Sequence, residues 1–319
     1  MRQRTNAYIL GVLGGSGGAP TKASSLDPKF EIAIRIGAYA AVFAALAAWE
    51  VLAPKRDLTI GRKPRWPNNL GILVVDALAV RLTVPTAAVG FAILAAERGW
   101  GLFPMLGVPG WLAALLGFLL LDLIIYAQHV AFHHVPALWR LHRMHHADLD
   151  IDVTTGVRFH PIEILLSLLI KIVAVVALGI PAVSVLIFEV VLNATSMFNH
   201  SNVTMPERLD RVMRWLVVTP DMHRVHHSVR RHETDSNFGF NLPWWDRLFG
   251  TYRALPEAGH TAMTIGIPLF RDPAELRIDR LLTQPFRNDA AQADAARRSS
   301  GGSAADPERR SSVGGASPS

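Results

Sequence analysis

Long apolar segments dominate this sequence and limit the folds that it can adopt. A helix needs about 20 apolar residues to cross the hydrocarbon core of a bilayer. The mean hydropathy of +0.25 is high for a soluble globular protein. The apolar segments cover approximately residues 32–52, 70–95, 111–128, 162–180 and 182–197. They predict an all-α fold, a polytopic transmembrane helical bundle with about four or five spans.

Charges and turn residues predict how these spans are oriented. The loop between residues 54 and 66 carries five cations against one anion, which predicts a cytoplasmic position by the positive-inside rule. Gly179 and Pro181 separate the last two apolar segments, so these should form a hairpin that enters the membrane and returns. Residues 129–160 and 200–232 would then form a histidine-rich helical cap on the cytosolic side, together with the basic loop.

Histidine is concentrated in the part of the chain that this topology brings together. Twelve of the thirteen histidines lie between His129 and His232. They include an HxxxH block that begins at His129 and two HxxHH blocks that begin at His142 and His223. Residues three and four apart share a helix face, whereas adjacent residues diverge by about 100°. The eight imidazoles of these blocks exceed the ligands that one ion accepts, so the blocks predict two metal ions.

A centre built from imidazoles beside apolar helices favours oxidation of a lipid over a structural zinc site. Neutral imidazole suits iron, zinc, copper and nickel, but a structural zinc ion needs only four ligands. The chain has no cysteine, which excludes thiolate zinc sites and iron–sulfur clusters. The net charge of +6 is spread along the chain and no nucleic-acid motif is present, so no nucleic-acid partner is expected.

Further motifs surround the histidine blocks. They are Asp122…Tyr126…His129, Val135-Pro-Ala-Leu-Trp139, Arg158-Phe-His-Pro-Ile-Glu163, Asn199-His-Ser-Asn202, and the segments 233–239 and 245–251. Together with the blocks, they resemble the fatty acid hydroxylase/sterol desaturase superfamily of integral-membrane diiron enzymes. The resemblance covers roughly residues 70–253. It implies a di-metal centre, with two irons in active enzymes, that activates O2 and oxidises an unactivated C–H bond of a lipid.

Carried over to this sequence, the resemblance implies nine metal ligands. They are His129, His133, His142, His145, His146, His200, His223, His226 and His227. His160 could be either a metal ligand or a residue that hydrogen-bonds to a ligand. His232 could be either such a hydrogen-bonding residue or a residue exposed to solvent. Asn199 lies near a position where some relatives have another histidine. Asp122 and Asp235 are candidates to orient ligand imidazoles, with a contact inside the bundle or a turn as the alternative.

The resulting hypothesis is an O2-dependent di-iron hydroxylase of a membrane-embedded lipid: an acyl chain, a sterol-like molecule or a carotenoid. It would need two iron ions, O2 and electrons from a separate partner such as a ferredoxin, a cytochrome or a reductase. One alternative is a desaturase with the same centre. Another is a non-catalytic membrane protein that binds or transports metal, for which histidines and acids should line a path within the spans.

These expectations divide the chain into three parts. Residues 1–28 are predicted to be a flexible N-terminal arm, residues 29–285 a membrane di-metal hydroxylase domain, and residues 286–319 a disordered tail. The protein should be an integral, multi-pass membrane protein with its histidine site on the cytoplasmic side, in the inner membrane if it is bacterial. The sequence leaves the oligomeric state open.

Overall fold

The computed structural model describes residues 28–287, and all regular elements in this range are helices. The predicted N-terminal arm and C-terminal tail therefore lie almost wholly outside the described residues. The elements are α2 (Pro28–Leu52), α3 (Trp66–Thr83), α4 (Ala87–Arg98), α5 (Leu102–Met105), α6 (Gly110–His134), α7 (Pro136–His146), η1 (Thr155–Val157), α8 (Pro161–Leu178), α9 (Ala182–His200), α10 (Glu207–Met213), α11 (Pro220–His226), α12 (Arg231–Thr234), α13 (Trp244–Leu248), α14 (Gly259–Ala262), η2 (Pro273–Leu276), α15 (Ile278–Thr283) and η3 (Gln284–Phe286).

Five helical stretches are long and apolar enough to cross a bilayer. They are Lys29–Leu52, Trp66–Met105, Gly110–His134, Pro161–Leu178 and Ala182–His200. Helices suit this environment because they satisfy every backbone polar group within the segment. The predicted all-α membrane bundle is thus confirmed, with five candidate spans among the described residues.

The second of these stretches is broken, whereas the sequence predicted one continuous span over residues 70–95. Helix α3 ends at Thr83 and α4 begins at Ala87. Pro85 lies in the break. Proline has no N–H to donate and disfavours the helical conformation of the residue before it, here Val84. The apolar pattern runs through this break, which is why periodicity alone did not reveal it.

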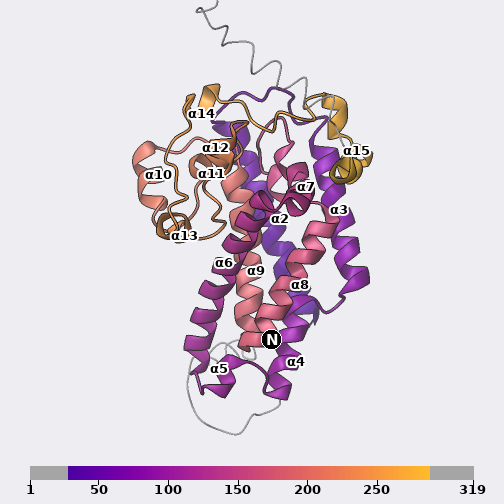
Figure 1. Cartoon of the computed structure of the whole chain (residues 1–319), viewed down its shortest axis with the longest axis vertical. Coiled ribbons are helices and arrows are strands. Elements are labelled where there is room, and N and C mark those ends of the chain that lie inside the picture. The colour runs from indigo at the N-terminus through magenta and orange to yellow at the C-terminus, as the bar shows by residue number, and fades with distance from the viewer. Residues whose placement is uncertain (1–27, 288–319) are drawn as a thin grey trace, which may run out of the picture.

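The predicted hairpin between the last two spans is present. Gly179 ends α8 in the left-handed region, with φ +70°, and donates its N–H to Val175 O at 2.9 Å. A β-carbon on Gly101 would lie 2.2 Å from the backbone nitrogen of Gly179, so these two loops touch. His160, just before α8, and His200, at the end of α9, consequently lie at the same end of the bundle (Figure 1).

The bundle core lies between α4, α6, α8 and α9. Buried aliphatic side chains such as Leu121, Val175 and Val185 form it, and Phe118 packs edge-on against Phe188 with ring centroids 5.4 Å apart. Helix α9 packs against α2, α4 and α6, while α8 packs against α3, α4 and α6. This arrangement fixes the positions from which α8 and α9 meet the cap.

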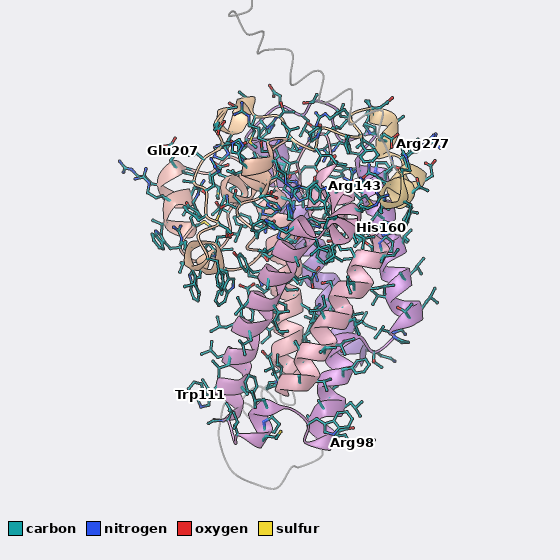
Figure 2. The ribbon with its side chains drawn as sticks, viewed as in Figure 1. Arg98, Trp111, Arg143, His160, Glu207 and Arg277 are labelled. Carbon is teal, nitrogen blue, oxygen red and sulfur yellow. The ribbon has the colours of Figure 1, made fainter. Side chains whose placement is uncertain are left out.

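All of the remaining helices except α5 form a cap at one end of the bundle. Figure 1 shows α7, α11, α12, α14 and α15 gathered there, with α5 at the opposite end. Figure 2 shows Arg143, His160 and Arg277 in the cap, and Arg98 and Trp111 at the far end.

The basic loop after α2 is part of the cap. Arg65 is fully buried and donates to Asp148 Oδ1 at 2.7 Å and to Asp152 Oδ2 at 2.5 Å. Asp150 accepts backbone N–H groups of residues 59–61 at 2.7 to 3.1 Å. This loop, whose charge predicted the orientation in the membrane, thus also holds in place the segment 148–152, which follows the second histidine block.

Candidate metal centre

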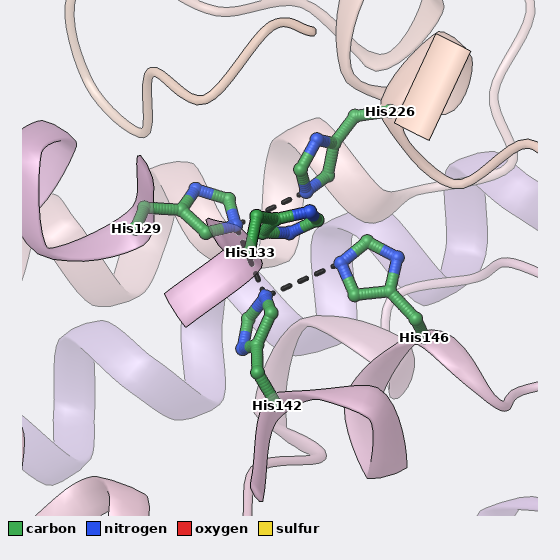
Figure 3. Close-up of side chains that lie close together, drawn as sticks. All are labelled: His129, His133, His142, His146 and His226. Atoms are coloured by element: carbon green, nitrogen blue, oxygen red, sulfur yellow. Dashed lines mark hydrogen bonds between the residues drawn. The ribbon is translucent and has the colours of Figure 1, made fainter. Parts of the chain in front are cut away.

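Five buried histidines converge on one point in the cap. His129 and His133 come from α6, His142 and His146 from α7, and His226 from α11. One ring nitrogen from each of these residues lies within 4.8 Å of the others (Figure 3). The members that share a helix are four residues apart, so each helix presents one face to this five-histidine cluster.

A second, four-histidine cluster lies beside the first. It consists of His145 from α7, His200 from the end of α9, and His223 and His227 from α11 and its C-cap. Their ring nitrogens also lie within 4.8 Å of one another. Both HxxHH blocks therefore divide between the clusters, because adjacent histidines on a helix point about 100° apart.

The hydrogen bonds of the first cluster define its protonation. His129 Nδ1 lies 2.7 Å from Phe238 O, and His226 Nδ1 lies 2.7 Å from Ser236 O. A carbonyl oxygen only accepts, so both Nδ1 atoms carry the proton and both Nε2 atoms are left with a lone pair. These two Nε2 atoms are 3.0 Å apart. Two lone pairs at this distance cannot form a hydrogen bond, but a cation can bind both.

The second cluster repeats this pattern. His145 Nδ1 lies 3.1 Å from Arg158 O, and His200 Nδ1 lies 2.7 Å from Ser196 O. Their Nε2 atoms are 3.0 Å apart. Neither ring nitrogen of buried His227 has a partner. The donor set of both clusters thus fits a metal ion, which accepts lone pairs from neutral imidazole.

Burial keeps these imidazoles neutral. It lowers the pKa of His142 to about 3 and lowers the pKa of His145, His223 and His227 well below the usual value. Neighbouring imidazoles add to the effect on the last three, because a second positive charge would repel the first. Neutral imidazole is the form that binds metals.

Two carboxylates support histidines of the first cluster. His142 Nδ1 lies 2.7 Å from Glu163 Oε1, and His133 Nδ1 lies 3.3 Å from Asp235 Oδ1. Such contacts fix the tautomer and orientation of a ligand imidazole and raise its basicity. Asp246 supports His129 indirectly. It accepts hydrogen bonds from the backbone N–H groups of Phe238 and Gly239 and thereby positions the Phe238 carbonyl, which accepts from His129 Nδ1.

The structure separates the remaining candidates from the clusters. His160 caps α8 through Nδ1, and its Nε2 lies 3.2 Å from Leu282 O. His232 is exposed and pairs with Glu257. Asn199 donates to Phe240 O at 3.1 Å. Asp122 accepts from Trp245 Nε1 at 2.8 Å and from Leu242 N at 3.2 Å, so it holds the cap against α6.

Sequence reasoning missed Glu163 as a site residue, although its motif was noted. It also missed the four backbone carbonyls that set the tautomers, those of Phe238, Ser236, Arg158 and Ser196. Any residue has a carbonyl, so no sequence signal marks them. The signal for Glu163 was its place two residues after Pro161, in the first turn of a helix that begins beside the histidines.

A cavity of about 780 Å³ connects the first cluster to the interior of the bundle. His129 and His142 line its cluster end, together with aromatic side chains such as Phe159 and Phe240. From there it follows one face of α8, from Glu163 to Lys171, and one face of α9, from Ser196 to Glu189. The latter distance is seven residues, or about 10 Å of helix. An elongated apolar molecule could therefore reach the histidines from within the membrane.

Comparison with known proteins identifies the segment that carries the histidines. Residues 114–251 match the family model for fatty acid hydroxylase. This segment belongs to the fatty acid hydroxylase family. The predicted superfamily resemblance is thus confirmed, and all nine clustered histidines lie within the matched segment. Helices α2 and α3, which line the cavity, lie outside it.

The similar curated proteins are oxidoreductases named for lipids. Ornithine lipid hydroxylase of Rhizobium tropici is 32% identical over 151 residues, which cover 47% of this chain and 44% of that protein. Alkylglycerol monooxygenase of Homo sapiens is 30% identical, over 54% of this chain and 37% of that protein. Cholesterol 25-hydroxylase of Rattus norvegicus is 28% identical, over 44% of this chain and 46% of that protein. The chain thus spans less than half the length of these relatives, and no solved structure matches it significantly.

Proposed function

We propose that this chain is a membrane-bound di-iron oxygenase that hydroxylates a lipid. The observation that carries the proposal is the opening of the five-histidine cluster, through His129 and His142, into a cavity inside an apolar bundle. The family of the matched segment and the names of the relatives support the same chemistry. A storage or transport protein would not need a lipid-sized cavity that ends at its metal ligands.

The nine clustered histidines would hold the two ions. The five-histidine cluster would bind one ion and the four-histidine cluster the other. Bound iron would supply the activation of O2. Glu163 and Asp235 would keep His142 and His133 in the metal-binding tautomer, while Phe132, Phe159 and other apolar side chains would exclude water from the reacting end of the cavity.

The reaction needs a source of electrons. Insertion of one oxygen atom of O2 into a C–H bond consumes two electrons and two protons and releases the other atom as water. The proposal therefore includes a separate donor: a ferredoxin, a cytochrome or a reductase. Its docking site would be on the cap, because the cap holds both clusters and faces away from the apolar bundle.

Hydroxylation is preferred over desaturation for this centre. Both outcomes begin with removal of a hydrogen atom from a C–H bond, so the histidine geometry does not favour either. The three relatives named above are two hydroxylases and a monooxygenase. Transferred as a proposal, their names favour a product that gains one oxygen atom over one that loses two hydrogen atoms.

The cap is proposed to lie on the cytoplasmic side, in the inner membrane if the organism is bacterial. The cations of the loop after α2 support this orientation. Exposed apolar side chains on the flank of the cap, including Val212, Trp215 and Leu216, are suited to the headgroup region. These side chains would fix the depth of the cap in the membrane.

The test combines metal analysis with product analysis. The purified protein should hold about two iron ions per chain, as expected for two clusters of this donor set. His145→Ala and His226→Ala each remove one member of a different cluster, so each should lose metal and lipid hydroxylation. His134→Ala is the matched control, because His134 is exposed and its Nδ1 contacts only Val130 O.

Lipids from cells that express the protein should gain one oxygen atom, labelled when the cells are grown in isotopically labelled O2. A loss of two hydrogen atoms instead would indicate the desaturase. Full metal content and unchanged oxidation in both cluster variants would rule out the proposed centre. Many exchangeable ions per chain, without any oxidised lipid, would favour a metal-binding or transport protein.

A further inference from the structure

The cluster end of the cavity contains acidic groups with unused hydrogen-bonding capacity. Asp76 on α3 and Glu163 on α8 both line the cavity and are only 6% and 4% exposed. Asp76 Oδ1 and Glu163 Oε2 have no hydrogen-bond partner. Gln128 Oε1, on the same cavity wall, is also buried without a partner. Buried polar atoms without partners are costly, so this end of the cavity is built to receive donors.

The two carboxyl groups come from neighbouring helices. Helices α3 and α8 pack against each other, and Asp76 and Glu163 line the same cavity. Glu163 Oε1 is already used by His142, which leaves its second oxygen for another donor. A ligand group with several N–H donors could satisfy both free oxygens.

The cations that line the cavity are engaged elsewhere. Arg35 and Lys171 both pair with Glu189, at 2.7 and 2.6 Å. Arg81 donates to Pro85 O at 3.2 Å. These three side chains therefore do not satisfy the free oxygens of Asp76 and Glu163, which remain available to a ligand.

We propose that this end of the cavity binds the protonated amine of an aminolipid. An ammonium group offers three donors and no acceptor, which matches the three free oxygens of Asp76, Glu163 and Gln128. The remaining cavity, along α8 and α9, would hold the apolar chain of the same molecule. This inference rests on the proposed lipid hydroxylase function and narrows its substrate class.

The position of the amine has a consequence for the site of oxidation. Glu163 touches His142, a member of the five-histidine cluster. A substrate held by its amine at Glu163 places carbon atoms near that amine next to the cluster, and carbon atoms far along the chain away from it. A sterol-like molecule or a carotenoid without such an amine would leave the carboxylates unsatisfied and should bind weakly.

Asp76 adds to this pocket a residue from outside the segment that matches the family. Glu163 and Gln128 lie within the segment matched to the family, but Asp76 lies outside it, on α3. The two carboxyl groups thus come from different parts of the chain: Glu163 lies within the matched segment, and Asp76 lies before it, on α3. Substitution of Asp76 can therefore test the selectivity without touching a histidine or a neighbour of a histidine.

The experiment measures binding of simple probes to the purified, metal-loaded protein in lipid nanodiscs under anaerobic conditions. The probes are octadecylamine, its N-acetyl derivative and octadecanol, which share one chain length and differ in the donor group. Octadecylamine should bind about tenfold or more tightly than the other two, as expected for charge-assisted hydrogen bonds to buried carboxylates. Native mass spectrometry can report the bound fraction and the metal content of the same molecule.

Asp76→Asn keeps the size of the side chain but removes its charge, so the preference for the amine should fall to near unity. Ser167→Ala is the matched control, because Ser167 lines the same cavity and carries no charge. Full metal content in both variants will show that the fold is retained.

Equal binding of the three probes by the unchanged protein would overturn the inference, since water alone would then satisfy the carboxyl groups. Equal binding of amine and alcohol would replace the aminolipid by a lipid with any donor group. Retention of the amine preference in Asp76→Asn would also overturn it. None of these results depends on O2 or on turnover, so they are independent of the metal and oxidation tests of the proposed function.

Discussion

At the scale of single residues, Glu163 links the metal centre to the wall of the cavity. Its contact to His142 Nδ1 is the shortest carboxylate contact made by any clustered histidine in residues 28–287. Glu163→Gln replaces an acceptor-only carboxylate by an amide and should lower metal affinity by about 10–100-fold, as for other groups that orient a metal ligand. Competition with a chelator measures this affinity.

Asp122→Asn serves as the control for that prediction. Asp122 is a buried acid that accepts from Trp245 and Leu242 and touches no histidine. Its substitution should leave metal affinity near that of the unchanged protein. An equal loss of affinity in both variants would show that the effect arises from general disturbance of the cap.

The different fates of these two acids show what residue patterns can predict. Asp122 lies seven residues before His129 on the same helix face, which suggested a supporting role. Seven residues correspond to about 10 Å along the axis, too far for a direct hydrogen bond. Glu163 instead reaches His142 across 21 residues of sequence and a turn of the chain. Helical spacing predicts which residues of one helix share a face, so it identified the histidines. It cannot predict the contact of Glu163 with His142, because these residues lie on two different helices.

Arg65 provides a second prediction at this scale. Its guanidinium is fully buried between Asp148 and Asp152. Arg65→Met would leave buried Asp152 without its cation and Asp148 with only Arg158, 3.4 Å away, and should lower the free energy of unfolding by about 3–5 kcal/mol. Thermal or chemical unfolding of the purified protein in detergent measures the change.

Arg62→Met is the matched substitution in the same loop. The side chain of Arg62 is 33% exposed and lies 3.8 Å from the buried carboxylate of Glu50. One long contact from a partly exposed cation stabilises less than two short buried contacts, so this variant should lose clearly less than Arg65→Met. Similar losses in the two variants would indicate that the loop is held by its backbone and not by the buried pair.

At the scale of elements, the turn between α8 and α9 positions one end of each helix. Gly179 has φ +70°, and a β-carbon there would lie 2.6 Å from Pro104 Cδ and 2.8 Å from Trp100 O. Gly179→Ala should therefore cost about 1–2 kcal/mol for its left-handed backbone and a further 1–3 kcal/mol for overpacking. The free energy of unfolding measures the sum.

Gly107→Ala measures the cost of the left-handed backbone conformation without the cost of overpacking. Gly107 has φ +62°, and nothing lies within 4 Å of its ideal β-carbon position. It should show the backbone cost alone, so the difference between the variants reports the contact with the loop at α5. Equal costs would mean that the two loops separate easily.

Elements were predictable from the sequence to different degrees. The five apolar stretches and the turn at Gly179 followed from composition and from residues with special backbone preferences. The break between α3 and α4 did not, although Pro85 was visible, because the apolar pattern continues on both sides of it. The short helices of the cap, such as α12 and α13, are four and five residues long and have too few turns for a periodic signal.

At the scale of the whole molecule, the absence of cysteine allows a direct test of orientation. Arg277→Cys places a thiol on the cap (Figure 2), and Met105→Cys places one on α5, at the opposite end of the bundle (Figure 1), where Met105 is 79% exposed. With the cap in the cytoplasm, a membrane-impermeant maleimide added to intact cells should label Met105→Cys only. Lysed cells should label both.

The reverse pattern in intact cells would place the cap outside and contradict the proposed orientation. The charge of the loop after α2 predicted the side, but the structure gives that loop a second role, in which Arg65 is buried in the cap. Part of the positive charge is therefore neutralised within the fold. The labelling experiment decides the orientation without relying on a count of charges.

Both clusters include residues from the last histidine block, which has a consequence for the order of assembly. His129 and His226 are 97 residues apart in the sequence but in contact in the fold. Synthesis proceeds from the N-terminus, so α6 and α7 exist well before α11. Neither cluster can be complete until the hairpin of α8 and α9 has entered the bilayer and His223–His227 has been made. Metal incorporation should thus be a late event in the biogenesis of this protein, after membrane insertion.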